Sequence, residues 1–135
     1  MTLGDDNERA LGFAKLVQGL SHGYIALMFD KGFILDESVD LASGILELAP
    51  YTDVMDAAIA QLEAAIAIFN ANDFTLPNDW INGKAFTSAE LSQLAHSFIA
   101  RYMALLPRDK TQRAAVNWSS VLTHLDAGLT EDWGV

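Results

Sequence analysis

The helical character of this chain is clearest in residues 53–69, which read DVMDAAIAQLEAAIAIF. Large apolar residues recur there at the three- and four-residue spacing of an α-helix, at Met55, Ile59, Leu62, Ile66 and Phe69. A narrow polar edge separates this stripe from a second one made of small residues, Ala57, Ala60, Ala64 and Ala67. A helix that is apolar around most of its circumference is usually central in its domain. We therefore expect this helix at the centre of the fold.

Four other segments have helical periodicity, and we expect helices over residues 7–29, 37–49, 88–106 and 109–126. The apolar face expected for the last of these is Ala114, Trp118, Val121, Leu122 and Leu125. The fold class predicted is all-α, an antiparallel bundle of about five helices. Its one long connection is the loop between the third and fourth helices, residues 70–86.

Local start signals support two of these helices. Thr87-Ser88-Ala89-Glu90 is a capping box, in which the Thr87 hydroxyl and the Glu90 carboxylate each satisfy a free backbone N–H group. Asp36 is a suitable N-cap for the helix over residues 37–49. Within the long loop, Asn82-Gly83 predicts a type I′ turn and a small hairpin over residues 80–85.

The first helix carries three glycines, Gly12, Gly19 and Gly23, along one strip. Glycine costs roughly 1 kcal/mol relative to alanine inside a helix, so the strip indicates either a kink or the close approach of another backbone. The expected core face is a neighbouring stripe of large residues: Phe13, Leu16, Val17, Leu20, Tyr24, Leu27 and Met28. Lys15, Gln18 and His22 are expected on the opposite, polar side.

Length and composition indicate one domain, residues 1–135, with a loose tail over about 129–135. The chain has no cysteine, which excludes disulfides, thiolate catalysis and cysteine zinc sites. No basic region precedes an apolar run at the N-terminus, and no apolar run approaches the ~20 residues of a membrane span. We therefore expect a cytoplasmic protein with no membrane partner.

The net charge of −10 is distributed unevenly. Thirteen of the eighteen acidic residues but only three of the eight basic ones lie at or before Gly83, so the rest of the chain is neutral. An acidic surface disfavours nucleic acid and anionic membranes, which need basic contacts. It permits a basic partner, and it also serves solubility.

No catalytic or cofactor motif is present. The sequence has no Gly-x-Ser-x-Gly elbow, no glycine-rich phosphate loop and no two histidines four residues apart. The clustered carboxylates stand at predicted helix starts, where they stabilise the helix dipole. We therefore predict no catalytic residues, no cofactor and no metal, and we expect the purified protein to carry no stoichiometric transition metal.

Two features remain as candidate binding elements. The first is a polar stripe on the last helix, Arg113, Asn117, Ser120 and His124. Its residues could hold a carboxylate or phosphate, but the favoured interpretation is the ordinary solvated face of a surface helix. The second is the loop of residues 70–86 with Trp80 and Lys84. Long loops are often functional, but the aromatic residues of this one could equally cap the end of the bundle.

Three functional hypotheses follow. The preferred one is a non-enzymatic helical module that acts through protein contacts, as a homo-oligomer, with a homodimer as the default, or as an adaptor. The second is a small-ligand-binding bundle with a pocket under the 70–86 loop. The third is an enzyme whose site is assembled from isolated residues such as His96, Arg101 and Tyr102.

Overall fold

The computed structural model describes residues 7–44 and 46–132, and most of them are helical. In chain order the elements are α1 (Asn7–Met28), β1 (Lys31–Gly32), the 3-10 helix η2 (Leu41–Ser43), β2 (Ala49–Pro50), α2 (Tyr51–Ala71), α3 (Ser88–Leu105), α4 (Lys110–Ala114) and α5 (Trp118–Asp126). The predicted all-α class is confirmed. The only sheet in the described residues is a short antiparallel pair, with Lys31 opposite Pro50 and Gly32 opposite Ala49.

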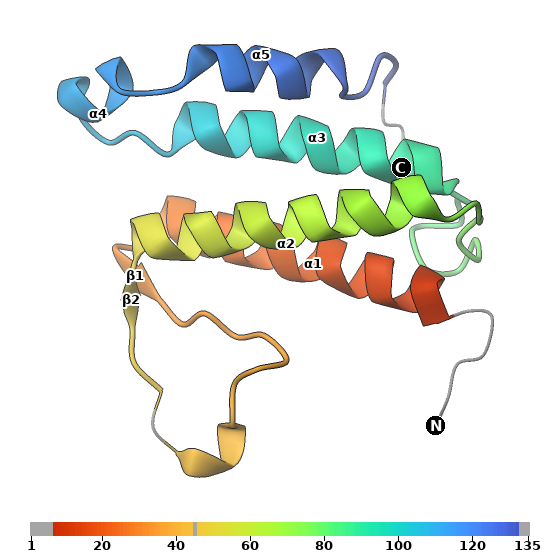
Figure 1. Cartoon of the computed structure of the whole chain (residues 1–135), viewed down its shortest axis with the longest axis horizontal. Coiled ribbons are helices and arrows are strands. Elements are labelled where there is room, and N and C mark those ends of the chain that lie inside the picture. Colours follow the sequence, from red (N-terminus) through yellow and green to blue (C-terminus); the bar gives the residue numbers. More distant parts are fainter. Residues whose placement is uncertain (1–6, 45, 133–135) are drawn as a thin grey trace.

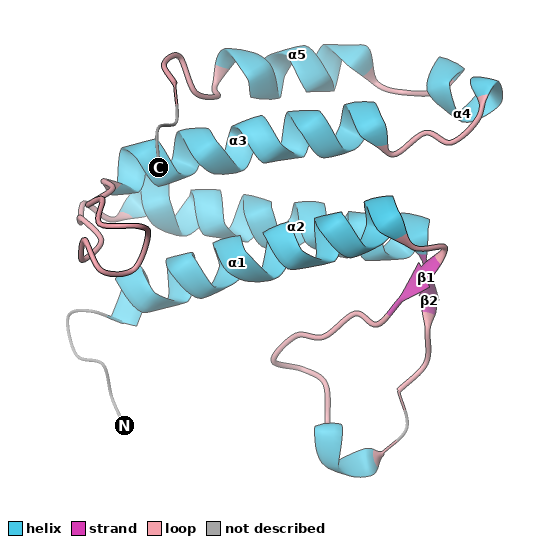
Figure 2. Ribbon diagram, turned by 180° about the vertical axis from the view of Figure 1, so that it is seen from behind, coloured by secondary structure: helices cyan, strands magenta, loops and turns pink. Residues whose placement is uncertain are grey.

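The three long helices α1, α2 and α3 and the shorter α5 lie side by side along the long axis of the molecule (Figure 1). α2 packs against both α1 and α3, and α3 also packs against α5. Among the described residues, α5 packs against no helix other than α3. α5 therefore forms an outer layer, as Figure 2 shows from behind.

The glycine strip of α1 is the face that packs against α2 and α3. A Cβ atom on Gly19 would lie 2.7 Å from Leu62 Cγ and 2.9 Å from the Ala58 carbonyl oxygen. A Cβ on Gly23 would lie 2.1 Å from the ring of Tyr102. The expected close approach of another backbone is therefore confirmed.

This approach changes which residues of α1 are buried. The large stripe expected in the core is only partly covered: Val17 and Tyr24 are each 44% exposed and Met28 is 76% exposed. The expected outward position of His22 is wrong, because its side chain is buried. Because the glycines let α1 approach its neighbours along their strip, the flanking large residues lie at the edges of the contact.

The small residues of α2 that meet α1 and α3 are not those of the predicted alanine stripe. Ala58 and Ala65 are fully buried, whereas Ala60 and Ala67 are exposed on the same side as Asp56 and Glu63. The alanine stripe therefore does not face the glycine strip.

The predicted helix over residues 37–49 is wrong. Its described residues, 37–44 and 46–49, project from the bundle (Figure 2) and contain only η2 and the start of β2 as regular elements. The Asp36 carboxylate accepts a bond from the Ser38 N–H, and Asp40 caps η2 by accepting one from the Ala42 N–H. Such local side-chain bonds compete with helix formation. Gly44, at φ 68°, then ends η2 in the left-handed region.

Residues 33–37, which lead into this segment, are held by polar side chains of α1. The Leu35 N–H donates to His22 Nε2 at 3.1 Å, and Gln18 donates to the Leu35 carbonyl at 2.7 Å. Lys15 pairs with Glu37 at 2.7 Å. The proton of His22 is therefore on Nδ1, which lies 2.8 Å from Gln61 Oε1 of α2. These bonds hold the chain in an extended form just where the predicted helix would begin.

Residues 72–87 close one end of the bundle. Leu76 and Phe86 are buried, and the Leu76 N–H donates to the Phe86 carbonyl at 2.8 Å. Asn82 and Gly83 both have positive φ, and the Lys84 N–H donates to the Ile81 carbonyl at 2.8 Å. The predicted type I′ turn is thus confirmed.

The start of α3 forms as its sequence predicts. The Glu90 N–H donates to Thr87 Oγ1 at 3.3 Å, and the Thr87 N–H donates to Glu90 Oε2 at 2.8 Å. Both halves of the capping box are therefore present. These bonds to the ionised carboxylate lower the pKa of Glu90.

The predicted single helix over residues 109–126 is divided. α4 ends at Ala114, and Asn117 then caps α5 by accepting a bond from the Ser120 N–H at 3.1 Å. At the other end of α5, the Leu129 N–H donates to Ser97 Oγ of α3 at 2.9 Å. Both ends of α5 are thereby fixed, and residues 133–135, including Trp133, lie outside the described residues.

Candidate functional site

α5 has an apolar side that the other described residues leave largely exposed. Trp118 is 49% exposed, Leu122 59% and Leu125 53%. We call these three residues the α5 face. Sequence periodicity placed all three on the apolar face of the last helix, and in the structure this part of the face is exposed. Of the predicted apolar face only Val121 is buried, because α5 is a short helix with a single helical neighbour.

The predicted polar stripe is divided between different environments. Arg113 belongs to α4 and is exposed, while Asn117 is the N-cap of α5. Ser120 and His124 are half-buried against α3, where Ser120 Oγ contacts Met103 Sδ at 4.0 Å. The structure therefore does not gather the four residues into one anion site.

His124 instead meets a histidine of α3. His96 Nδ1 and His124 Nδ1 lie 2.8 Å apart, and the two ring centroids are 5.0 Å apart. Burial and the neighbouring charge of His124 lower the pKa of His96. In the hydrogen bond between the two Nδ1 atoms, one ring donates its Nδ1 proton and the other accepts it.

The other residues of the possible enzyme site are not close partners of His96. Tyr102 is buried, and its hydroxyl donates to the Leu20 carbonyl of α1 at 2.9 Å. Burial raises the pKa of Tyr102, so this group keeps its proton. Arg101 is exposed. These positions do not bring a nucleophile, a base and an orienting group together.

The two candidate residues of the 70–86 loop, Trp80 and Lys84, pack against aromatic and basic residues of the same chain. Trp80 stacks at a tilt against Phe13 of α1, with centroids 5.1 Å apart, and lies 5.9 Å from the guanidinium carbon of Arg9. Lys84 Nζ lies 5.9 Å from the ring centroid of Phe86. These contacts, with Leu76 and Phe86 buried, favour the interpretation of the loop as a cap. Two hollows border the loop, one of about 500 Å3 lined mainly by residues 69–73 and one of about 260 Å3 lined in part by Lys84 and Phe86.

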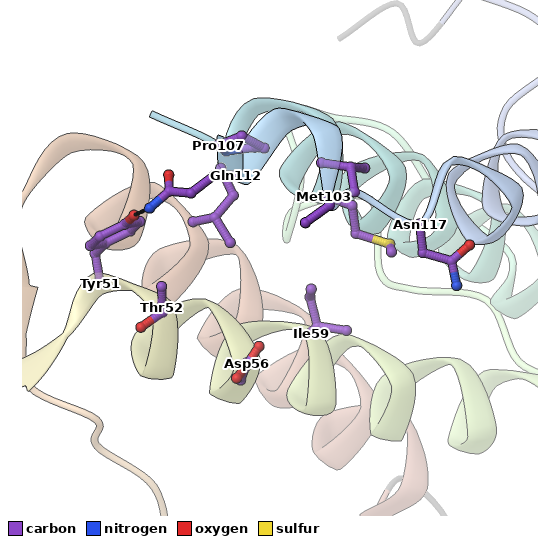
Figure 3. A pocket seen from close by; sticks show the side chains of 11 residues that line it. Tyr51, Thr52, Asp56, Ile59, Met103, Pro107, Gln112 and Asn117 are labelled. Carbon is purple, nitrogen blue, oxygen red and sulfur yellow. Dashed lines mark hydrogen bonds between the residues drawn. The ribbon is translucent and has the colours of Figure 1, made fainter. Parts of the chain in front are cut away.

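A groove of about 340 Å3 lies elsewhere, between α2, the end of α3 and α4. Its lining is mainly apolar, with Ile59, Met103 and Leu106 among its residues, and Asp56 and Asn117 add polar groups (Figure 3). At one end Gln112 donates a hydrogen bond to the Tyr51 hydroxyl at 2.7 Å. α4 is thereby tied to α2 and bounds the groove.

Arg108 holds the α3–α4 connection to the end of α1. Its guanidinium donates to the Ala26 carbonyl at 3.1 Å and to the Phe29 carbonyl at 2.7 Å, and it pairs with Asp30. The same group lies 3.8 Å from the ring centroid of Tyr51. Arg108 thus supplies donors to carbonyls at the C-terminal end of α1, where a cation is favourable.

Searches of protein-family models, curated proteins and solved structures found no match for this chain. Among the described helices, α2 is long and apolar enough to span a bilayer by length and composition. A core helix passes the same test. The position of α2 between α1 and α3, with Asp56 and Glu63 on its exposed side, accounts for its composition.

Proposed function

We propose that this chain is a non-enzymatic helical interaction module that associates with a second copy of itself through the α5 face. The observation that carries the proposal is the exposure of Trp118, Leu122 and Leu125 on one side of a helix whose polar Ser120 and His124 face α3. Exposed aromatic and aliphatic residues in such an arrangement are typical of the centre of a protein interface.

Charge favours a second copy at this surface. No Asp, Glu, Lys or Arg lies between Asn117 and Leu125, and the chain from Lys84 onward is neutral. Met28 and Phe29 are also exposed, but they belong to the half that carries the whole net charge of −10. Two copies that met through that half would repel each other, whereas two α5 faces would not.

The spacing of the α5 face is self-complementary. Trp118 and Leu125 are two helical turns apart, with Leu122 between them. If two α5 helices pair antiparallel about a twofold axis near Leu122, Trp118 of each copy lies against Leu125 of the other. A twofold interface of this kind closes after two copies.

The α5 face is too small to form the whole interface. A nine-residue helix is only about 14 Å long, from a rise of roughly 1.5 Å per residue. Stable dimers bury roughly 1,200–2,000 Å2 in total. The neighbouring exposed residues of α4 are expected to provide the polar rim, with Lys110 and Arg113 as its charges.

Light scattering at micromolar concentration tests the proposal. The wild-type chain should have twice its mass of 14.7 kDa. Leu122→Glu should be a monomer, because a carboxylate at the centre of the interface would be desolvated without a partner. Thr123→Glu is the matched control, because Thr123 is also exposed but lies outside the α5 face, and it should stay dimeric. A wild-type monomer across the concentration range would refute the proposal.

The groove between α2 and α4 is the observation that favours a small-ligand-binding function as the second candidate. Its mainly apolar lining with a few polar groups is the usual composition of a ligand pocket. A thermal-shift screen with small apolar compounds tests this. Met103 lines the groove, so a tryptophan there should fill it. Compounds that stabilise the wild-type chain but not Met103→Trp, in a protein that is monomeric, would favour ligand binding over self-association.

A further inference from the structure

His96 and His124 are the one pair of histidines that the described fold brings into contact, and neither belongs to the α5 face. They come from antiparallel helices and are 28 residues apart in the chain. Their Nδ1 atoms lie 2.8 Å apart, and their ring planes are tilted by 43°. Both rings are only half-buried, so small solutes can reach the pair from solvent.

We propose that His96 and His124 are the two protein ligands of a site for a divalent transition-metal ion of tetragonal geometry, with Ni2+ and Cu2+ as the ions that fit. Neutral imidazole nitrogens are common ligands of both ions. Two metal–nitrogen bonds of about 2.0–2.1 Å that meet at a right angle place their nitrogens about 2.9 Å apart, whereas a tetrahedral angle places them about 3.3 Å apart. The 2.8 Å separation of the two Nδ1 atoms is close to that of neighbouring positions in a tetragonal site. Each ring must turn so that its Nδ1 lone pair is directed at the ion instead of at the other nitrogen.

The protons of the pair are conserved when the metal binds. In the metal-free pair one ring carries its proton on Nδ1 and donates it to the bare Nδ1 of the other. In the metal-bound pair both Nδ1 atoms coordinate the ion and both rings carry their protons on Nε2. The donor ring moves its proton from Nδ1 to Nε2 through water, so no net proton is released. Water fills the remaining coordination positions.

A metal ion at this position would act on the attachment of α5. Among the described helices α5 packs against α3 alone, and His96 and His124 lie on the two sides of that contact. An ion that bridges them therefore holds α5 to α3, and it stabilises the folded chain by mass action. This effect does not require self-association, because both ligands belong to one chain and face each other inside it.

Calorimetric titration of the tag-free protein with Ni2+ tests the proposal. One Ni2+ should bind per chain, and His96→Gln and His124→Gln should each lower the affinity at least tenfold. Ser119→Ala is the matched control on the exposed side of α5 and should bind as the wild type does. Absence of binding up to millimolar Ni2+, or unchanged binding in both glutamine variants, would overturn the proposal.

A second measurement locates the ion in the wild-type chain, and it decides the matter even if the glutamine variants fold poorly. Substoichiometric Cu2+ should broaden the amide NMR signals around His96 and His124 before all others. Broadening that begins instead at the acidic residues of the 36–47 segment, or around the buried His22, would assign the ion to another place and refute the two-histidine site.

Discussion

The contact between α1 and α2 makes a sharp prediction about Gly19. In most helices a change from glycine to alanine is stabilising by roughly 1 kcal/mol, because alanine has the higher helix propensity. At Gly19 the added Cβ would lie 2.7 Å from Leu62 Cγ and 2.9 Å from the Ala58 carbonyl oxygen. One of these atoms belongs to the backbone of α2, so the two helices must separate to accept the methyl group.

Overpacking of this kind typically costs about 1–3 kcal/mol. Because one contact is with a backbone atom, the cost at Gly19 should lie in the upper part of this range, about 2–3 kcal/mol. The propensity gain of roughly 1 kcal/mol offsets part of it, so Gly19→Ala should lower the free energy of unfolding by about 1–2 kcal/mol. Urea denaturation followed by circular dichroism measures the change. Ala14→Gly is the matched control, because Ala14 is exposed on α1, and it should cost about 1 kcal/mol from propensity alone. If Gly19→Ala is as stable as the wild type or more so, the two backbones are not in close contact there.

Three further predictions concern single contacts. Thr87→Ala should cost about 1 kcal/mol in the same assay; a change below about 0.2 kcal/mol, far under the usual cost of losing a cap, would mean that the capping box is not formed. The ionised Glu90 carboxylate accepts the Thr87 N–H and hydroxyl bonds more strongly than a neutral carboxyl or amide oxygen does. The stability that Glu90 adds relative to Glu90→Gln should therefore be complete above its ordinary pKa of 4.5 and disappear as the pH falls through its lowered folded-state pKa. A difference that persists at pH well below the folded-state pKa would contradict this. Arg108→Ala should cost about 1–2 kcal/mol through lost charge-assisted bonds at the end of α1, and Arg108→Lys should restore only part of it, since one ammonium cannot replace the planar guanidinium that also lies over Tyr51.

Features that depend on neighbouring residues in the chain could be predicted from the sequence. The capping box at Thr87 and the type I′ turn at Asn82–Gly83 are satisfied by atoms a few residues away, so the residue types alone specify them. The glycine strip of α1 also indicated a close backbone approach. It did not identify the partner, which is Leu62 and Ala58 of α2 rather than the alanine stripe.

The helix predicted over residues 37–49 failed for a reason that lies far away in the chain. His22, held by Gln61 of α2, accepts the N–H of Leu35, and this contact fixes the backbone just before the segment. The short bonds of Asp36 and Asp40 then favour turns over a continuous helix. The periodicity of apolar residues cannot predict such a contact, because it indicates only which residues share a face of a helix.

The candidate site was missed for a related reason. Periodicity correctly places Trp118, Leu122 and Leu125 on one side of a helix, but it does not say whether another element covers that side. The pairing of His96 with His124 depends on how α3 and α5 align. The only sequence signal for it would have been their similar distances from the connection of residues 106–117 that joins the two helices.

The central claim is that two copies meet through the α5 face, and an engineered disulfide tests it most directly. The chain has no cysteine, so Leu122→Cys places a single thiol next to the proposed twofold axis. A disulfide requires the two Cα atoms to come within about 7 Å of each other, which only the proposed pairing allows. Mild oxidation should convert Leu122→Cys to a covalent dimer and leave Thr123→Cys, outside the α5 face, mostly monomeric. Equal yields of covalent dimer from the two variants, or none from Leu122→Cys, would contradict the account.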